Sequence, residues 1–481
     1  MSNSTISISR RSFLKTTALG AAAAAAGPAA WAVPAVSRQR PPNLLFINVD
    51  QLSVNALPQF GCQQVQTPNL DRLACRGTSF QLSHCADPLC SPSRACWFTG
   101  RAPTEHGMLF NDRGFQLHPS IPDLGAWLRD GGYETYYGGK WHVLGRDLGG
   151  SFKVLHEACT VGEHSDAALS RACEGFFEHR PASAAPFFLV AALMNPHDIC
   201  GWIGLNLKPL PEFPYPEIEA QLPPLPPNFN FDTREPEFFI SRTRKSVLHY
   251  SAQWSETIWR YYAWSYYRQV EMVDASIGRI LDALDNSPHA DNTVVVFTSD
   301  HGDAIGCHRL TTKLSFYQNS VGVPMIVSWP DQVPENHVDR THLVSGFDLT
   351  PTLCDYAGKA PPPDQRGLSL RPVLENRAAS WRDYVVAHNY VIGRMARSAR
   401  YKYIAYQGDK TDQLFDLAND PWETKNLSGD AAHTGPLADH RRMLTEWESR
   451  LKPLPEPPGG WIRQLEAPTK INKTAKKRVA T

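Results

Sequence analysis

Two short apolar runs, each ending in acidic or amide side chains, place the strongest constraint on how this chain can fold. The first is NLLFINVDQ at 43–51, and the second is NTVVVFTSDHGD at 292–303. Runs of this length without polar alternation are typical of strands buried on both faces, as in parallel sheets. A third run, PFFLVAALMN at 186–195, has the same character. Strands of this kind need helices on both faces of the sheet, so the sequence predicts an α/β fold.

The remaining segments complete this prediction. Helical spacing of apolar residues occurs at 68–77, 120–140, 260–287 and 347–358, and a further strand is predicted within 323–330. We therefore predict a large, mixed but mostly parallel sheet sandwiched by helices over residues 33–380. Short alternating pieces after Trp381 predict a small C-terminal antiparallel sheet with a closing helix over 381–452. The proline-rich segment 205–240 is predicted to be a surface loop, and 453–481 a disordered tail, Pro/Gly-rich and then basic.

Charge balance and the N-terminus limit the functional classes. Lys plus Arg and Asp plus Glu both number 48, so no overall field attracts nucleic acid or a membrane surface. An anion must therefore be bound by a local site. Paired Arg10 and Arg11, an Ala-rich run and the small-residue end at 30–32 resemble a twin-arginine export signal over 1–32. The run is shorter than the roughly 20 residues of a membrane span. We expect a periplasmic or secreted protein with no membrane span in the mature chain.

Polar residues at the strand ends predict a metal site. Asp50 and Gln51 end the first run, and Asp300 and His301 follow the strand in the second. The carboxyl ends of parallel strands meet at one edge of the sheet, where ligands bind. Two carboxylates, an amide oxygen and an imidazole suit one divalent cation. The alternative is that Asp50 and Asp300 only cap the segments that follow them.

The stretch CSPSRACWFTGR at 90–101 predicts a helix start that could bind an anion. Ser91 and Pro92 favour a first helical turn, so Cys90 would lie beside free backbone N–H groups. Arg94, one turn further, could clamp the same anion. The alternative is a cysteine buried in an amphipathic helix, which is the interpretation we give to Cys96. No CxxC pair occurs among the ten cysteines, and their pairing cannot be read from the sequence.

These motifs together resemble the sulfatase family, within the alkaline-phosphatase-like superfamily. PLCSPSRACWFTG at 88–100 resembles its first signature, whose C-x-P-x-R core is the site of oxidation of cysteine to formylglycine. GGYETYYGGKWH at 131–142 is similar to the second, although Gly138 stands where Ala or a small branched residue is usual. Further similar segments follow in the expected order, at 194–198, 298–303, 311–327, 347–358 and 414–427. The resemblance covers about residues 42–430.

The resemblance implies a fold, a reaction and a set of roles. The fold would be alkaline-phosphatase-like, and a formylglycine-generating enzyme would convert Cys90 to formylglycine, whose hydrate is both nucleophile and metal ligand. One cation, most commonly Ca²⁺, would bind Asp50, Gln51, Cys90, Asp300 and His301. The sulfate would be surrounded by Arg94, Lys140 and Lys313. His142 would steady or deprotonate the hydrate, and His197 would protonate the leaving oxygen.

Two departures from the family pattern leave alternatives open. Many sulfatases have Asp where Gln51 stands and Asn where His301 stands, so Mn²⁺ or Mg²⁺ is less firmly excluded. Lys140 and His142 are the sulfatase-like pair beyond the metal site. We expect hydrolysis of a sulfate ester on a carbohydrate. The alternatives are a phosphonate monoester or phosphodiester hydrolase, a choline sulfatase, and a sulfated-glycan-binding protein without catalysis.

Overall fold

The computed structural model describes residues 40–157, 161–205, 213–230, 235–241, 250–377, 380–456 and 460. The predicted export signal at 1–32 and the tail beyond residue 460 lie outside these residues. The elements named below all belong to one compact unit, Pro41–Thr481.

The central sheet has eight strands in the order β5-β4-β6-β1-β7-β8-β2-β9. Their bounds are β1 Asn43–Asp50, β2 Thr78–Phe80, β4 Glu134–Gly139, β5 Lys153–Glu157, β6 Phe187–Pro196, β7 Thr293–Ser299, β8 Met325–Ser328 and β9 His337–Asp339. The neighbouring strands from β5 to β7 pair in parallel, and β8 pairs antiparallel to β7. The predicted large, mostly parallel sheet is confirmed.

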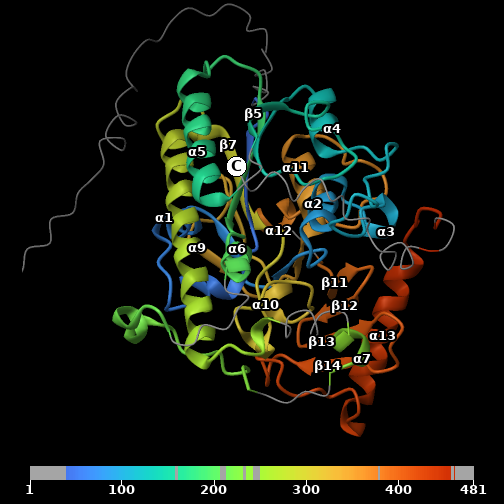
Figure 1. Cartoon of the computed structure of the whole chain (residues 1–481). Helices are drawn as coiled ribbons and strands as arrows, with labels where there is room; N and C mark the ends of the chain where they lie inside the picture. The colour runs from blue at the N-terminus through green and yellow to red at the C-terminus, as the bar shows by residue number, and fades with distance from the viewer. Residues whose placement is uncertain are drawn as a thin grey trace, which may run out of the picture. The chain divides into compact units, whose positions relative to one another are not determined.

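Helices cover both faces of this sheet because alternate residues of its central strand enter two different cores. Leu45, Ile47 and Val49 of β1 pack with α1 (Pro68–Cys75), α5 (Gly162–His179) and α9 (Glu256–Asp285). Leu44 and Phe46 pack with α2 (Cys90–Thr99), α4 (Leu124–Asp130) and α11 (Leu349–Tyr356). Figure 1 shows the first group of helices on the left of the sheet and the second group on the right.

One stretch folds differently from its predicted helix. In 120–140 only α4 is helical, and Glu134–Gly139 forms β4 instead. Gly131 ends the helix, and Gly132, at φ 97°, turns the chain into the strand. Pairing with β6 then outweighs the helical spacing of the side chains. The described parts of the predicted 205–240 loop contain only the short turns Pro216–Gln221 and Glu237–Phe239.

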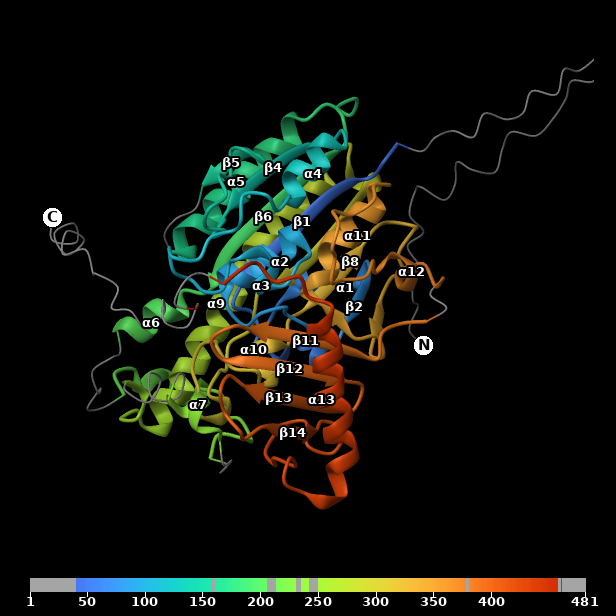
Figure 2. The ribbon, with the colours of Figure 1, turned by 90° about the vertical axis from the view of Figure 1, so that its right-hand side faces the viewer.

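A second sheet forms near the C-terminus. Its antiparallel strands are β11 (Tyr384–Asn389), β12 (Gly393–Ser398), β13 (Tyr401–Tyr406) and β14 (Gln413–Asp416). Helix α13 (Thr434–Ser449) packs on it through Leu437 and Leu444 (Figure 2). The predicted small antiparallel sheet and closing helix are confirmed, whereas a domain boundary at residue 380 stays a prediction. The smaller elements are β3 Ser83–His84, α3 Pro103–His106, α6 Ile199–Leu205, α10 Gln318–Val321, β10 Val344–Ser345 and α12 Arg371–Leu374.

Candidate active site

The predicted polar side chains lie at the ends of four neighbouring strands, at one edge of the sheet. Lys140 follows β4, and His197 follows β6. Asp50 is the last residue of β1, and Asp300 follows β7. These strands are adjacent in the sheet, so residues that are up to 250 positions apart in sequence become neighbours. Gln51 and His301 come next along the chain from the two aspartates.

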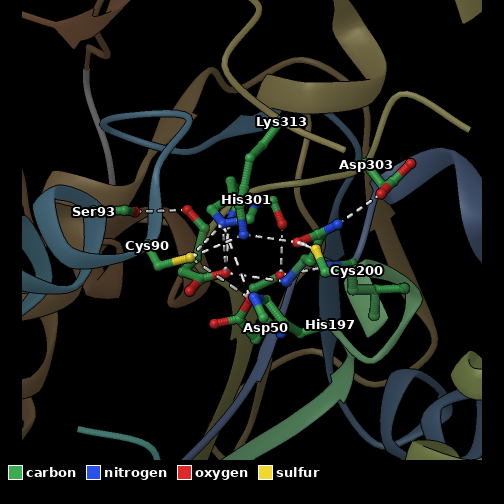
Figure 3. Close-up of polar contacts among 12 residues, drawn as sticks. Asp50, Cys90, Ser93, His197, Cys200, His301, Asp303 and Lys313 are labelled. Atoms are coloured by element: carbon green, nitrogen blue, oxygen red, sulfur yellow. Dashed lines mark hydrogen bonds and ion pairs between the residues drawn. The ribbon is translucent and has the colours of Figure 1, made fainter. Parts of the chain in front are cut away.

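A buried cluster at this edge could hold a cation. One ligand atom from each of Asp50, Cys90, Asp300 and His301 lies within 4.8 Å of the others. The Cys90 Sγ is 3.1 Å from His301 Nε2 and 3.8 Å from Asp50 Oδ1. Figure 3 shows Asp50, Cys90 and His301 converging from different segments.

Cys90 is placed by the start of α2. The helix begins at Cys90, as the sequence predicts, and all of its residues are buried, with Cys90 itself 1% exposed. Ser93 anchors the first turn by donating from Oγ to the Asp300 carbonyl at 2.6 Å. The Ser91 N–H donates to Asn111 Oδ1 at 2.9 Å. The helix start is therefore fixed directly against the end of β7.

The charges around Cys90 favour its ionised form. Burial and the Asp50 carboxylate oppose ionisation of the thiol, yet Lys313, Lys140 and His301 hold the pKa of Cys90 well below its usual range. Lys313 is the nearest cation, with Nζ 3.1 Å from Sγ. Burial alone would lower the pKa of Lys313, but Cys90, Cys200 and Asp50 raise it, so the ammonium stays charged. This corner of the site is electropositive and suits an anion.

The two aspartates have different environments. Burial disfavours the charge on Asp50, but Lys140, Lys313 and Arg94 outweigh burial and hold its pKa well below the usual range. Lys140 Nζ donates to Asp50 Oδ2 at 2.6 Å. For Asp300, burial and repulsion from Asp50 raise the pKa to about 6, against the opposing charges of His301 and Arg94. A divalent cation between the two carboxylates would relieve this repulsion.

Arg94 is fully buried and its donors point at protein acceptors. Nε donates to Asp300 Oδ2 at 2.9 Å, and Nη2 to Asp50 Oδ2 at 3.2 Å. Nη1 donates to Asn48 Oδ1 and to the Lys140 carbonyl. The structure thus places Arg94 as the counter-charge of both carboxylates. Its predicted contact with sulfate stays a prediction.

Gln51 has a fixed side-chain orientation. Its Nε2 donates to Asp303 Oδ2 at 2.7 Å, so Oε1 is the atom that faces Lys313 Nζ, 2.8 Å away. The Asp303 carboxylate also accepts from the Tyr262 hydroxyl and from the Ile305 N–H. Sequence reasoning did not single out Asp303 or Tyr262. The only available signal was that Asp303 ends the quoted motif TSDHGD.

The two predicted proton-transfer histidines are placed differently. His197 Nε2 lies 4.0 Å from Asp50 Oδ1, and its side chain is 26% exposed. Burial, assisted by Lys313 and Lys140, lowers the pKa of His197 to about 3, although Asp50 and Cys90 oppose this. His142 adopts a positive φ of 53°, and its buried Nδ1 has no hydrogen-bond partner among the described residues. The predicted role of His142 stays a prediction.

The donor set fits a hard divalent cation. His301 Nδ1 donates to the Gly302 carbonyl at 2.9 Å, so Nε2 is the atom that faces the cluster and that would bind a cation once it has lost its proton. Both Arg94 and Lys140 bind Asp50 through Oδ2. Within the described residues no N–H donor reaches Asp50 Oδ1 at hydrogen-bond distance, so this oxygen is available to an ion. Oxygen and imidazole ligands of this kind suit calcium, magnesium or manganese.

Comparison with known families gives consistent matches over nearly the whole chain. The family model described as Sulfatase matches residues 42–359, and the model described as N-sulphoglucosamine sulphohydrolase, C-terminal, matches 306–449. The model of the twin-arginine translocation signal sequence matches 7–27, which indicates export across the membrane. Among the described residues, no helix combines the length and apolar character needed to cross a membrane.

Individual relatives agree with these matches. The chain is 33% identical over 443 residues to a Delta 4,5-hexuronate-2-O-sulfatase of Bacteroides thetaiotaomicron, covering 87% of this chain and 91% of the relative. It is 27% identical to a choline-sulfatase of Rhizobium meliloti, covering 80% and 82% of the two chains. The solved structure of a 2-O GAG sulfatase superposes with a TM-score of 0.76 at 31% identity, covering 85% and 92% of the two chains. A phosphonate monoester hydrolase of Agrobacterium radiobacter shares the fold, with a TM-score of 0.70 at 22% identity over 85% and 96% of the chains.

Proposed function

The chain belongs to the sulfatase family and is a sulfuric ester hydrolase, and from this premise we propose that it desulfates saccharides with a formylglycine made from Cys90 and one divalent cation. The observation that carries the proposal is the position of Cys90. Its Sγ lies 3.1 Å from both Lys313 Nζ and His301 Nε2, at the electropositive edge of the sheet. A nucleophile at this point meets an anionic sulfate where the protein already supplies positive charge.

The proposed modification and cation each supply one kind of chemistry. Hydrated formylglycine supplies a geminal diol, so that one hydroxyl can attack sulfur and the second allows sulfate to leave without attack by water at sulfur. The cation, held by Asp50, Gln51, Asp300 and His301, supplies positive charge that favours the deprotonated nucleophile. We propose Ca²⁺, with Mn²⁺ or Mg²⁺ as the other candidates.

The side chains of this chain perform the remaining tasks. Lys313 and Lys140 stabilise negative charge that develops on the sulfate oxygens, because their ammonium groups are already ordered by Cys90 and Asp50. His197 is the proposed acid for the leaving oxygen. In the free enzyme its imidazole is neutral, and the negative charge of a bound sulfate ester raises its pKa toward the range in which it can donate a proton.

A saccharide is the proposed carrier of the sulfate. The relatives named as a hexuronate-2-O-sulfatase and an N-acetylglucosamine-6-O-sulfatase are both named for sugar substrates, and they cover 87% and 89% of this chain. The twin-arginine signal fits an enzyme that meets glycans outside the cytoplasm. The two phosphonate monoester hydrolase structures are 22% identical to this chain and therefore support only the fold.

Two experiments test the proposal. Peptide mass spectrometry on active protein from a host with a formylglycine-generating enzyme should find an aldehyde or its hydrate at Cys90. Active protein that contains only the unmodified thiol would overturn the mechanism.

The second experiment compares substrates in parallel: sulfated mono- and oligosaccharides, choline sulfate, an aryl sulfate and a phosphodiester. We expect the highest kcat/KM for a sulfated sugar. A kcat/KM for choline sulfate or the phosphodiester well above that for every sugar would reject the saccharide assignment and leave the Cys90 chemistry in place.

A further inference from the structure

A pocket of about 640 Å³ is lined by none of the proposed catalytic or cation-binding residues. Its walls come from the segment after β1, the proline-rich run 223–227, helix α9 and the C-terminal sheet with its loops. Two of these walls continue from active-site segments, because Asn55 follows Gln51 and Asn319 follows Lys313 along the chain. Asn55 Nδ2 donates to Asn319 Oδ1 at 2.7 Å, which joins the two walls.

The lining of this pocket combines apolar side chains with carboxamides and carries one charged side chain. Arg397 is the cation, and no Asp, Glu or Lys lies among the described lining residues. The lining carboxamides are Asn55, Gln63, Gln64, Gln81, Gln318 and Asn319. Carboxamides both donate and accept hydrogen bonds, as a hydroxyl-rich ligand requires.

Behind this lining, the buried charges do not balance. Arg397 on β12 and Lys402 on β13 are directly opposite in the antiparallel pairing, so both side chains lie on one face of the sheet. They are 5% and 0% exposed. The nearby buried carboxylate, Glu423, pairs with Lys402 and accepts the Gln318 N–H at 2.6 Å. Two cations thus share one carboxylate, and one positive charge is left over.

The cation without a carboxylate partner is Arg397, and this residue lines the pocket. Among the described ion pairs none joins a carboxylate to Arg397, and its buried Nε has no hydrogen-bond partner. Its Nη1 donates to the Ser398 carbonyl. Burying a guanidinium without a counter-ion is unfavourable, so an anion that pairs with Arg397 would stabilise it. The pocket that Arg397 lines is the space in which such an anion fits.

The other lining side chains offer apolar faces. Phe60, Tyr267 and Trp422 line the pocket together with the prolines of 223–227, and Trp422 is 39% exposed. Flat apolar surfaces beside a few placed polar groups are typical of small-molecule sites. We propose that this pocket binds an acidic saccharide residue, with its sulfate or carboxylate on Arg397 and its hydroxyls on the carboxamides. That the anion is carried by a sugar rests on the proposed function.

The test is a binding titration with protein that cannot turn over. The mature chain carrying Cys90→Ala is titrated calorimetrically with a sulfated, uronate-containing tetrasaccharide, and we expect one site that depends on Arg397. Adding Arg397→Gln should weaken that site by about tenfold or more, because a charge-assisted contact is lost. Gln81→Glu, at a half-exposed lining position, should weaken it similarly without emptying the core. Arg400→Gln, which alters an exposed arginine paired with Asp416 on the same sheet, should leave binding unchanged.

Each outcome has a defined meaning. If the Arg397→Gln and Gln81→Glu proteins bind the tetrasaccharide with the same number of sites and the same affinities as Cys90→Ala alone, the proposal is overturned. Inorganic sulfate that fills the site as tightly as the tetrasaccharide overturns the saccharide part, as does equal binding of a neutral tetrasaccharide. Active enzyme with Arg397→Gln should retain its kcat/KM for an aryl sulfate, and a large loss would mean that the change acts on the active site instead.

The two proposals can also fail separately. If no sulfated sugar is hydrolysed but the Arg397-dependent site still binds the tetrasaccharide, the proposed function is wrong and the pocket stands. If sugars are desulfated and no Arg397-dependent binding is found, the pocket proposal is wrong alone.

Discussion

Replacing Asp303 with asparagine should loosen the cation site without touching a ligand. The Asp303 carboxylate accepts from three donors: Gln51 Nε2 at Oδ2, the Ile305 N–H at Oδ1, and the Tyr262 hydroxyl within reach of both oxygens. An asparagine must present its NH₂ either to Gln51 or to the Ile305 N–H, so one donor meets another donor. If Gln51 flips to avoid this, its amide N–H groups turn toward Lys313 and the cation position.

The loss of stability can be worked out from the one donor that loses its acceptor in Asp303→Asn. One buried donor left unpaired costs about 1–3 kcal/mol, and the weakening of bonds that lose the carboxylate charge adds about 1 kcal/mol. We therefore expect Asp303→Asn to lower the free energy of unfolding by about 2–4 kcal/mol. Loss of the orienting partner of a ligand should weaken Ca²⁺ binding by about 10–100-fold.

The assay combines chemical denaturation of the metal-free protein with Ca²⁺ titration. Asp274→Asn is the matched control, because its buried carboxylate also accepts one side-chain amide, from Asn69, and backbone N–H groups, among them that of Leu70. It should lose stability without a change in Ca²⁺ affinity. If Asp303→Asn behaves like Asp274→Asn and binds Ca²⁺ as the wild type does, the orienting role of Asp303 is wrong.

Three further predictions concern the chemistry and the pH dependence. Freshly purified Cys90→Ser should become sulfated once and then stall, because serine lacks a second hydroxyl; intact-mass spectrometry detects the adduct, and steady turnover would contradict the diol argument. His197→Ala should lower kcat/KM for a sulfated sugar by about 10²–10⁴-fold and that for an aryl sulfate with a good leaving group far less, whereas equal losses would rule out its role as the acid. Burial, assisted by the charges of Arg101 and His388, lowers the pKa of His106 to about 3, and Nδ1 accepts the Met108 N–H. The unfolded chain then binds more protons than the folded one between about pH 6.5 and pH 3, so stability falls as pH drops through that window, by about 2 kcal/mol from pH 7 to pH 5 for this residue. Denaturation midpoints should fall less steeply with pH in His106→Gln, and equal slopes would refute the assignment.

The strands at the centre of the molecule were predictable because both of their faces are buried. The runs at 43–51, 186–195 and 292–303 lose polar alternation for that reason, and parallel pairing then brings their ends together. The position of β4 was not predictable in this way, since pairing with β6 overrides its helical spacing.

Contacts between distant residues explain what the sequence could not show. Spacing places Arg94 one turn after Cys90, but it does not reveal that the guanidinium points at two carboxylates. The orientation of Gln51 depends on Asp303, 252 residues away. The excess charge beside Arg397 arises from cross-strand pairing with Lys402, which no sequence motif marks.

The burial of Cys90 bears on the order in which modification, folding and export occur. An enzyme that modifies the Cys90 thiol needs access to it, yet in the folded chain this residue is 1% exposed and all of helix α2 is buried. If Cys90 is converted to formylglycine as proposed, we expect the conversion to come before folding. The twin-arginine route carries chains that have already folded, so folding in turn comes before export. On this proposal, a chain that folded before conversion would be exported with an unmodified thiol at Cys90 and would lack the diol on which turnover depends.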